Sequence, residues 1–172
     1  MIIGSGDIAK AIADLDRNDV TFFASGVSDS KETNTDNFKR EEELLKKQPK
    51  DTHLVYMSSL SLYYSTESTP YLLHKKKMEA FVKSSFKSYT IVRIGNISWG
   101  NNPKTLLNYF TFCIKNDLPL KVIETYRHII DIDEFRYWIK LVRVGEQEEM
   151  NIPGKMVWVP ALVDSLTKDF GK

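Results

Sequence analysis

The stretch Met1-Ile-Ile-Gly-Ser-Gly-Asp-Ile-Ala9 joins a short apolar run to a glycine-rich turn and the start of a helical pattern. Glycines spaced as Gly4-x-Gly6-x-x-Ala9 between a strand and a helix let the backbone approach a pyrophosphate at the helix N-terminus. The alternative is a tight turn that needs glycine only for its dihedral angles. We predict a strand before this turn, a helix over 7–15 after it, and a dinucleotide-binding loop between them.

Two features of the neighbouring sequence count against a dinucleotide site. Asp7 brings a negative charge close to the position of the pyrophosphate. A dinucleotide-binding unit also carries an acidic residue about twenty residues after the glycines, at the end of its second strand, where it binds the ribose. No acidic residue ends a predicted strand at that distance in this chain.

Strand and helix patterns alternate along the rest of the chain. Apolar runs bounded by turn residues predict strands, and apolar residues at helical spacing predict helices. The alternation predicts an α/β fold with an open, mostly parallel sheet flanked by helices, and 172 residues suffice for one domain. The predicted strands cover 20–24, 53–57, 89–94, 120–123 and 128–132, and the predicted helices cover 38–47, 71–86, 105–116, 133–142 and 161–170.

Composition argues against several classes of function. The formal net charge is +1, with 27% charged and 42% hydrophobic residues, so we expect neither nucleic acid nor a membrane surface as a partner. Cys113 is the one cysteine, and His53, His74 and His128 fall in separate segments, so no metal site is predicted. No apolar run approaches the roughly 18 residues of a membrane helix, and we expect a cytoplasmic protein.

The stretch Tyr71-Leu-Leu-His-Lys75 contains a candidate catalytic pair. A tyrosine and a lysine four residues apart lie on one face of a helix, and a nearby ammonium lowers the pKa of a phenol. Such a tyrosine can exchange a proton with an alcohol or sugar oxygen while a nicotinamide transfers a hydride. The alternative is a solvated basic face with a packed tyrosine, in which Lys75 pairs with Glu79.

Two further positions are candidates for substrate binding. Ser58 and Ser59 end a predicted strand, at the sheet edge where open α/β sheets bind their ligands, although serines also end strands for local hydrogen bonding. Arg127 can hold a phosphate through two hydrogen bonds. The alternative for Arg127 is an internal ion pair with Asp131 or Asp133.

Taken in chain order, these motifs resemble the extended short-chain dehydrogenase/reductase family, the NAD-dependent epimerases and dehydratases of nucleotide sugars. The resemblance implies a Rossmann-like fold and extends over nearly the whole chain. The segments similar to the family motifs are Gly4–Ala9, Phe22–Gly26, Val55–Tyr63, Tyr71–Glu79, Val92–Gly100 and Arg127–Glu134.

The resemblance implies an epimerase, dehydratase or reductase that uses NAD or NADP and acts on a sugar or nucleotide sugar. It implies that Tyr71 is the general acid/base, that Lys75 activates it and binds ribose, and that Ser59 orients the substrate oxygen. The implied cofactor-binding residues are Gly4, Gly6, Asp7, Ile8, Ala24, Ser25, Gly26, Tyr71 and Lys75, and the implied substrate-binding residues are Ser59, Asn96 and Arg127.

The chain is shorter than the family pattern. Between the first helix and the strand at Val20 the family carries two more strands, and with them the residue that selects NAD or NADP. We expect one domain over 1–172, in which about 97–126 and 146–172 contribute a small, shortened substrate lobe. The first strand then has an open edge, which favours pairing with a second copy of the chain. The alternative function is a degenerate, non-catalytic family member that serves as a binding or assembly module.

Overall fold

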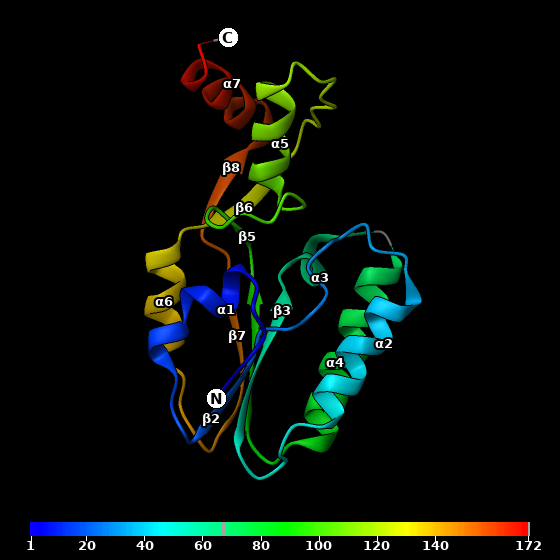
Figure 1. Cartoon of the computed structure of the whole chain (residues 1–172), viewed down its shortest axis with the longest axis vertical. Helices are drawn as coiled ribbons and strands as arrows, with labels where there is room; N and C mark the ends of the chain where they lie inside the picture. Colours follow the sequence, from blue (N-terminus) through cyan, green and yellow to red (C-terminus); the bar gives the residue numbers. More distant parts are fainter. Residues whose placement is uncertain (67, 172) are drawn as a thin grey trace.

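The computed structural model describes residues 1–66 and 68–171, which form a five-stranded sheet with flanking helices and a smaller second sheet (Figure 1). Neighbouring strands in the first sheet are all parallel. This confirms the predicted Rossmann-like α/β fold. The strands of the first sheet lie in the order β1 (Ile2–Ile3), β2 (Val20–Phe23), β3 (His53–Ser59), β4 (Tyr89–Ile94) and β7 (Gln147–Ile152).

Helices cover both faces of the first sheet, so its central strands are buried on two sides and read as apolar runs. α1 (Asp7–Ala11) and α6 (Ile132–Lys140) lie on one face, and α2 (Thr35–Lys46) and α4 (Pro70–Ser85) lie on the other (Figure 1). Each face has its own hydrophobic core. The first is built around Phe22, Val55, Val92 and Phe135, and the second around Phe23, Tyr56, Ile91 and Met78.

The helix of the predicted catalytic pair, α4, has clear start signals. The Thr69 hydroxyl oxygen accepts a hydrogen bond from the Leu72 backbone N–H at 3.3 Å, and Pro70 occupies the first turn. A threonine cap and an N-terminal proline both favour a helix start at this point. The predicted helix over 71–86 is confirmed, shifted by one residue.

A second, smaller sheet continues from the carboxyl edge of the first (Figure 1). It contains β5 (Asn96–Ile97), β6 (Tyr126–Ile130) and β8 (Lys155–Trp158), with β6 in the middle. α5 (Leu106–Lys115) and α7 (Val159–Asp169) pack against each other beside it. The range 146–172 predicted for the substrate lobe begins with β7, which belongs to the first sheet. A role of the second sheet in substrate binding stays a prediction.

The shortening of the fold is visible at β1. This strand is followed by α1, by a 3-10 helix over Ala13–Leu15 and then by β2, with which it pairs directly. Within residues 1–66 and 68–171, no strand lies beyond β1. One edge of the first sheet is therefore a two-residue strand, as expected from the loss of two strands.

Three segments differ from their predicted structure. The predicted strand over 120–123 is wrong: the segment is irregular, and the side chains of 121–123 are exposed. β7 and β8 are strands that the sequence pattern does not predict. In β7 only alternate residues are covered, and its Glu149 is held by ion pairs with Arg93 and Lys83.

Candidate active site

The predicted catalytic and cofactor-binding residues lie at the carboxyl edge of the first sheet, at a strand end, in loops and at the starts of helices (Figure 1). The glycine turn follows β1, the segment 24–26 follows β2, and Ser58 and Ser59 end β3. α4 begins at the same edge, with Tyr71 and Lys75 in its first turns. This is the edge at which open α/β sheets bind their ligands.

The glycine turn after β1 packs closely on the loop after β2. Gly4 has a φ of +135°, and a Cβ there would lie 2.5 Å from the carbonyl oxygen of Ala24. Only glycine tolerates this backbone conformation and this approach. At Gly6, by contrast, a Cβ would meet no atom within 4 Å, so the backbone is open to a ligand.

The residues that follow the turn are engaged with other parts of the chain. The Asp7 carboxylate accepts a hydrogen bond from the Asn102 backbone N–H at 3.0 Å, and the Asp7 carbonyl oxygen accepts one from Trp99 Nε1 at 3.3 Å. Ile8 packs against the core on the α6 face. The negative charge at Asp7 is thus present near the predicted pyrophosphate position, and it is bound to the loop after β5.

The loop after β2 is held from two sides. Arg40 of α2 donates to the Ser25 hydroxyl at 3.0 Å and to the Ser25 carbonyl oxygen at 3.1 Å. Gly26 lies directly over the end of Lys75, because a Cβ at Gly26 would be 2.6 Å from Lys75 Nζ. The loop therefore connects α2 to α4.

Ser58 and Ser59 have different surroundings. Ser58 is buried and donates to Glu79 of α4 at 2.6 Å. Ser59 is half-buried, and its hydroxyl lies 2.6 Å from that of Ser61, the first residue of α3 (Ser61–Tyr64). Because Ser58 is committed to a buried carboxylate, Ser59 is the better placed of the two to exchange a local hydrogen bond for a ligand.

Tyr71 lies in a small apolar cluster below the loop after β2. It is 6% exposed and packs with Val27, Leu72 and the partly buried Phe38. Its ring centroid is 6.0 Å from Lys75 Nζ. In the part of the chain that the structure describes, no other group forms a hydrogen bond with the Tyr71 hydroxyl.

Lys75 is buried and forms an ion pair that the sequence does not predict. Its Nζ is 3.0 Å from Glu41 Oε1 and 3.3 Å from the Tyr56 hydroxyl oxygen. Glu41 of α2 is fully buried, and it also accepts hydrogen bonds from the Tyr56 hydroxyl and the Val27 backbone N–H, each at 2.6 Å. The remaining contact of this carboxylate is with His74 Nε2, at 3.0 Å.

Glu79 takes part in a second buried ion pair. Arg93 of β4 donates from Nε to Glu79 Oε1 at 2.8 Å, from Nη2 to Glu149 at 2.6 Å, and from Nη1 to the Tyr63 hydroxyl at 2.7 Å. This network joins β4, β7 and α4 beneath the site. The Lys75–Glu79 ion pair considered from the sequence is therefore wrong, since the two residues face different charged groups.

Opposing effects act on the buried Glu41 carboxyl. Burial raises its pKa, but the Lys75 charge and the hydrogen bonds from His74, Tyr56 and Val27 lower it further, so the pKa of Glu41 lies well below its usual value. For the Tyr56 hydroxyl, burial raises the pKa, and the neighbouring Glu41 charge raises it more. At neutral pH Glu41 is therefore a carboxylate and Tyr56 a neutral phenol.

The free energy of unfolding is expected to fall as the pH drops below about 4.5, where an unfolded glutamate takes up a proton. Native Glu41 has a lowered pKa, so it binds fewer protons than the unfolded chain in that range. Its stabilising effect is complete above the unfolded pKa and is lost as the pH falls through the folded pKa. Denaturant unfolding between about pH 3 and pH 6 measures this slope. Glu41→Gln should make the slope shallower, and an equal slope would contradict the assignment.

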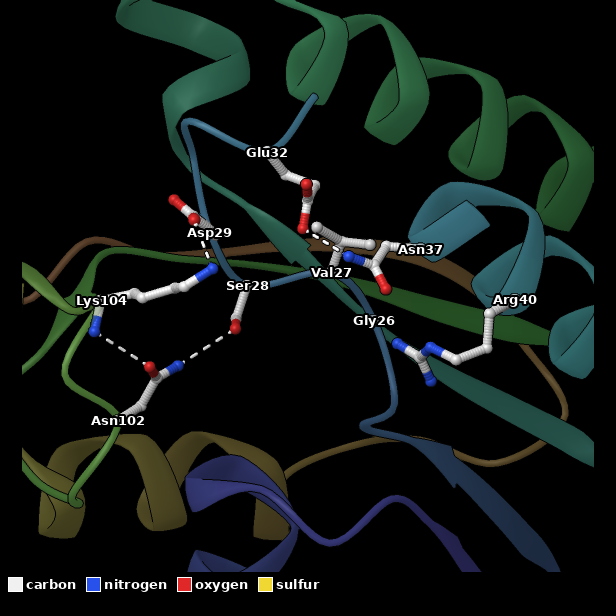
Figure 2. Close-up of a pocket in the computed structure, with 9 residues that line it drawn as sticks. All are labelled: Gly26, Val27, Ser28, Asp29, Glu32, Asn37, Arg40, Asn102 and Lys104. Carbon is white, nitrogen blue, oxygen red and sulfur yellow. Dashed lines mark hydrogen bonds and ion pairs between the residues drawn. The ribbon is translucent and has the colours of Figure 1, made fainter. Parts of the chain in front are cut away.

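A polar pocket of about 190 Å³ lies beside this edge, between the loops after β2 and β5 (Figure 2). Asn102 Nδ2 donates to the Ser28 hydroxyl at 3.1 Å, and Lys104 Nζ lies 2.8 Å from the Asp29 carboxylate. These contacts tie the two loops together across one side of the pocket, and α2 supplies the other side. The pocket is large enough for a small polar group and opens next to Gly26.

The predicted substrate-binding residues Asn96 and Arg127 lie on the second sheet. Asn96 Nδ2 donates to the His128 carbonyl oxygen at 2.9 Å. Arg127 Nη1 donates to the Thr125 hydroxyl at 3.3 Å and to the Tyr126 carbonyl oxygen at 3.1 Å. Within the described ranges Arg127 forms no ion pair with a carboxylate, so the internal pairing considered from the sequence is not observed.

Metal-ligating groups do not cluster in the described part of the chain: no three histidine, cysteine or carboxylate side chains there could hold a metal ion. His53, for example, lies in the core with its Nε2 2.9 Å from the Thr90 hydroxyl. None of the helices in residues 1–66 and 68–171 is long and apolar enough to span a membrane.

The residues present fit the nicotinamide half of a dinucleotide better than the adenosine half. The open backbone at Gly6 leaves room for a phosphate. Ser59, Tyr71 and Lys75, the residues predicted to act beside a nicotinamide, lie at the same edge of the sheet. The Asp7 carboxylate, by contrast, repels a pyrophosphate, and the described residues provide no strand beyond β1 to hold an adenosine ribose.

Glu41 is the residue of this site that sequence reasoning missed. It stands within a run of charged residues, which is typical of a solvated helix face. A signal was nonetheless present, because Glu41 shares one helical face with Phe38 and Leu45 at spacings of three and four residues. A glutamate on the apolar face of a helix indicates a buried cationic contact.

No protein-family model matches the sequence, and no curated protein matches it. Solved structures do match, at low identity. The dTDP-glucose 4,6-dehydratase of Bacillus anthracis, in complex with NAD, aligns with a TM-score of 0.67 and 19% identity over 96% of this chain and 61% of that chain. The UDP-glucuronic acid 4-epimerase of Bacillus cereus gives 0.66 and 15%, over 94% and 62%. The UDP-glucose 4-epimerase of Thermotoga maritima gives 0.63 and 18%, over 96% and 66%.

These likenesses establish the class of fold. The chain has a Rossmann-like fold, and solved dehydratases and epimerases of nucleotide sugars share this fold. The chain spans about three fifths of the length of the solved chains, 61% of the dehydratase and 62% of the glucuronic acid epimerase, so this version is shortened.

Proposed function

We propose that this chain is a shortened member of the extended short-chain dehydrogenase/reductase family that uses NAD or NADP to convert a nucleotide-linked sugar. One observation carries the proposal: the helix with Tyr71 and Lys75 starts at the carboxyl edge of the sheet, and it packs against β3, the strand that ends with Ser59. Structures of the same fold include a dehydratase in complex with NAD, and an epimerase with NAD and UDP-4-deoxy-4-fluoro-glucuronic acid.

In this proposal Tyr71 transfers a proton to or from a sugar oxygen, and Ser59 orients that oxygen by a hydrogen bond. A bound nicotinamide supplies the hydride transfer. The Lys75 ammonium, 6.0 Å from the Tyr71 ring, stabilises negative charge that develops on the reacting oxygens. The low exposure of Tyr71 excludes water from the transfer and strengthens these interactions.

Binding is assigned to the loops around this set. The backbone at Gly4 and Gly6, with the first turn of α1 after them, is proposed to contact the cofactor, together with the segment 24–26. Asn96 and Arg127, on the second sheet at the same end of the first sheet, are proposed to contact the substrate. A second copy of the chain is a further candidate partner, through the open edge of β1.

A non-catalytic binding or assembly module is the second candidate function. Two observations favour it. Lys75 is paired with Glu41 and is 2% exposed, and the open edge of β1 lacks the strands that complete an adenosine site. This candidate predicts that the protein binds neither NADH nor NADPH.

Calorimetric titration with NADH and with NADPH separates the two functions. We expect saturable binding of at least one, weakened because the adenosine half of the site is incomplete. Lys75→Gln should reduce this binding, whereas Lys76→Gln, a change at the neighbouring exposed lysine, should leave it unchanged. If the wild-type protein binds neither NADH nor NADPH, the enzyme function is rejected.

A further inference from the structure

Glu41 is a fully buried carboxylate that links three elements of the site. It accepts hydrogen bonds from the Val27 backbone N–H in the loop after β2 and from the Tyr56 hydroxyl on β3. From α4 it is contacted by His74 and Lys75, each at 3.0 Å. A buried charge is stable only where it is paired and hydrogen-bonded, so these groups are held in one arrangement around Glu41.

The loop after β2 also constrains the position of Lys75, through Gly26. The Cβ of any larger residue at Gly26 would lie 2.6 Å from Lys75 Nζ and 3.1 Å from Glu41 Oε1. The backbone of the loop after β2 therefore rests directly on the ion pair.

The ammonium retains capacity for a ligand in this arrangement. A lysine has three N–H donors, and the described residues take two of them, through Glu41 Oε1 and the Tyr56 hydroxyl. Gly26 and Tyr71 both lie near it, and both are proposed as cofactor contacts. A hydroxyl bound between the loop and Tyr71 could accept the third hydrogen.

We infer that Glu41 is the positioning residue of the site: it fixes Lys75 beneath Gly26, so that the ammonium can serve a cofactor hydroxyl and Tyr71 together. The inference rests on the proposed function. Glu41 itself is buried under the loop and acts through Lys75.

Glu41→Gln tests this role, with NADH binding followed by nucleotide fluorescence. Glutamine keeps the shape and removes the charge, so the Lys75 ammonium loses its charged partner. We expect NADH affinity to fall about ten-fold, the effect of one misplaced charged hydrogen bond. Glu79→Gln is the matched control, because Glu79 is also a buried carboxylate with a cationic neighbour, but that neighbour is Arg93. It should lower stability and leave NADH affinity within about two-fold.

The same change made in a Lys75→Met background shows whether Glu41 acts through Lys75. If it does, Glu41→Gln weakens NADH binding in the wild-type background and has little further effect once the ammonium is gone. Equal losses in both backgrounds, or unchanged or tighter binding in Glu41→Gln, overturn the inference. Should Glu41→Gln fail to fold, Gly26→Ala displaces the ammonium with Glu41 intact, and it should weaken NADH binding in the same way.

Failure of the proposed function has a different signature. If the wild-type protein binds neither NADH nor NADPH, the enzyme function is rejected. The denaturant midpoints of the wild type, Glu41→Gln, Lys75→Met and the double variant then test the Glu41–Lys75 pair alone. Coupled midpoints, in which the double variant loses less than the sum of the single losses, support positioning of Lys75 by Glu41. Additive midpoints overturn it.

Discussion

Arg93→Met is expected to lower the free energy of unfolding by about 3–5 kcal/mol, the usual loss when one member of a buried ion pair is removed. Arg93 is 5% exposed, and its guanidinium donates to Glu79, Glu149 and Tyr63. Without Arg93, the buried Glu79 carboxylate still accepts the hydrogen bond from the Ser58 hydroxyl. It loses the positively charged partner that Arg93 provides. Urea unfolding followed by circular dichroism measures the loss.

Two further variants sharpen this experiment. Arg143→Met is the matched control, because Arg143 forms surface ion pairs with Glu146 and Glu148, and such pairs contribute only about 0–1 kcal/mol. The double change Arg93→Met with Glu79→Leu should regain much of the stability, since it removes the stranded carboxylate. Equal midpoints for the wild type and Arg93→Met would rule out this network as a structural support of the sheet.

Tyr71→Phe is expected to reduce turnover by about 10²-fold or more, the contribution of a positioned general acid/base. Its effect on thermal stability should be small. The phenylalanine ring refills the same apolar cluster with Val27 and Leu72, and the lost hydroxyl forms no hydrogen bond with another described residue. Turnover is measured on UDP- and dTDP-linked hexoses with NAD and NADP, and stability by a thermal melt.

Tyr137→Phe is the matched control for this experiment, because Tyr137 is 59% exposed on α6 and stands outside the proposed site. It should leave both turnover and melting temperature unchanged. Full turnover in Tyr71→Phe would reject the proton-transfer role. A large drop in melting temperature would instead assign Tyr71 to packing.

Much of the fold was predictable, for a physical reason. β2, β3 and β4 are covered on both faces, so nearly every residue of each strand is buried. Each strand is therefore a mostly apolar run that the sequence alone reveals. β7 pairs only with β4 at the sheet edge, and its glutamates gain their stability from Arg93 and Lys83 on other elements. A local pattern does not carry that information, because it depends on which distant residues face the strand.

The candidate site shows the same division. The order of Ser59, Tyr71 and Lys75 along a strand–helix unit predicts that they meet one edge of the sheet, since parallel topology brings strand ends together. The ion pair between Glu41 and Lys75 spans 34 residues of chain and depends on how α2 packs against α4. Helical periodicity places Glu41 on the inner face, but only the packed structure names the residue it meets there.

The second sheet has a consequence for the order of folding. Its strands come from three separate stretches, residues 96–97, 126–130 and 155–158, so each pairing must first close a long loop. Closing a loop costs entropy before any contact repays it, and such pairings form slowly. During synthesis, a chain that has emerged as far as β4 already contains the strands and the helix that carry Ser59 and Tyr71. β7 and β8 emerge after β4, so we expect the β7 edge of the first sheet and the second sheet, with Asn96 and Arg127, to be completed last.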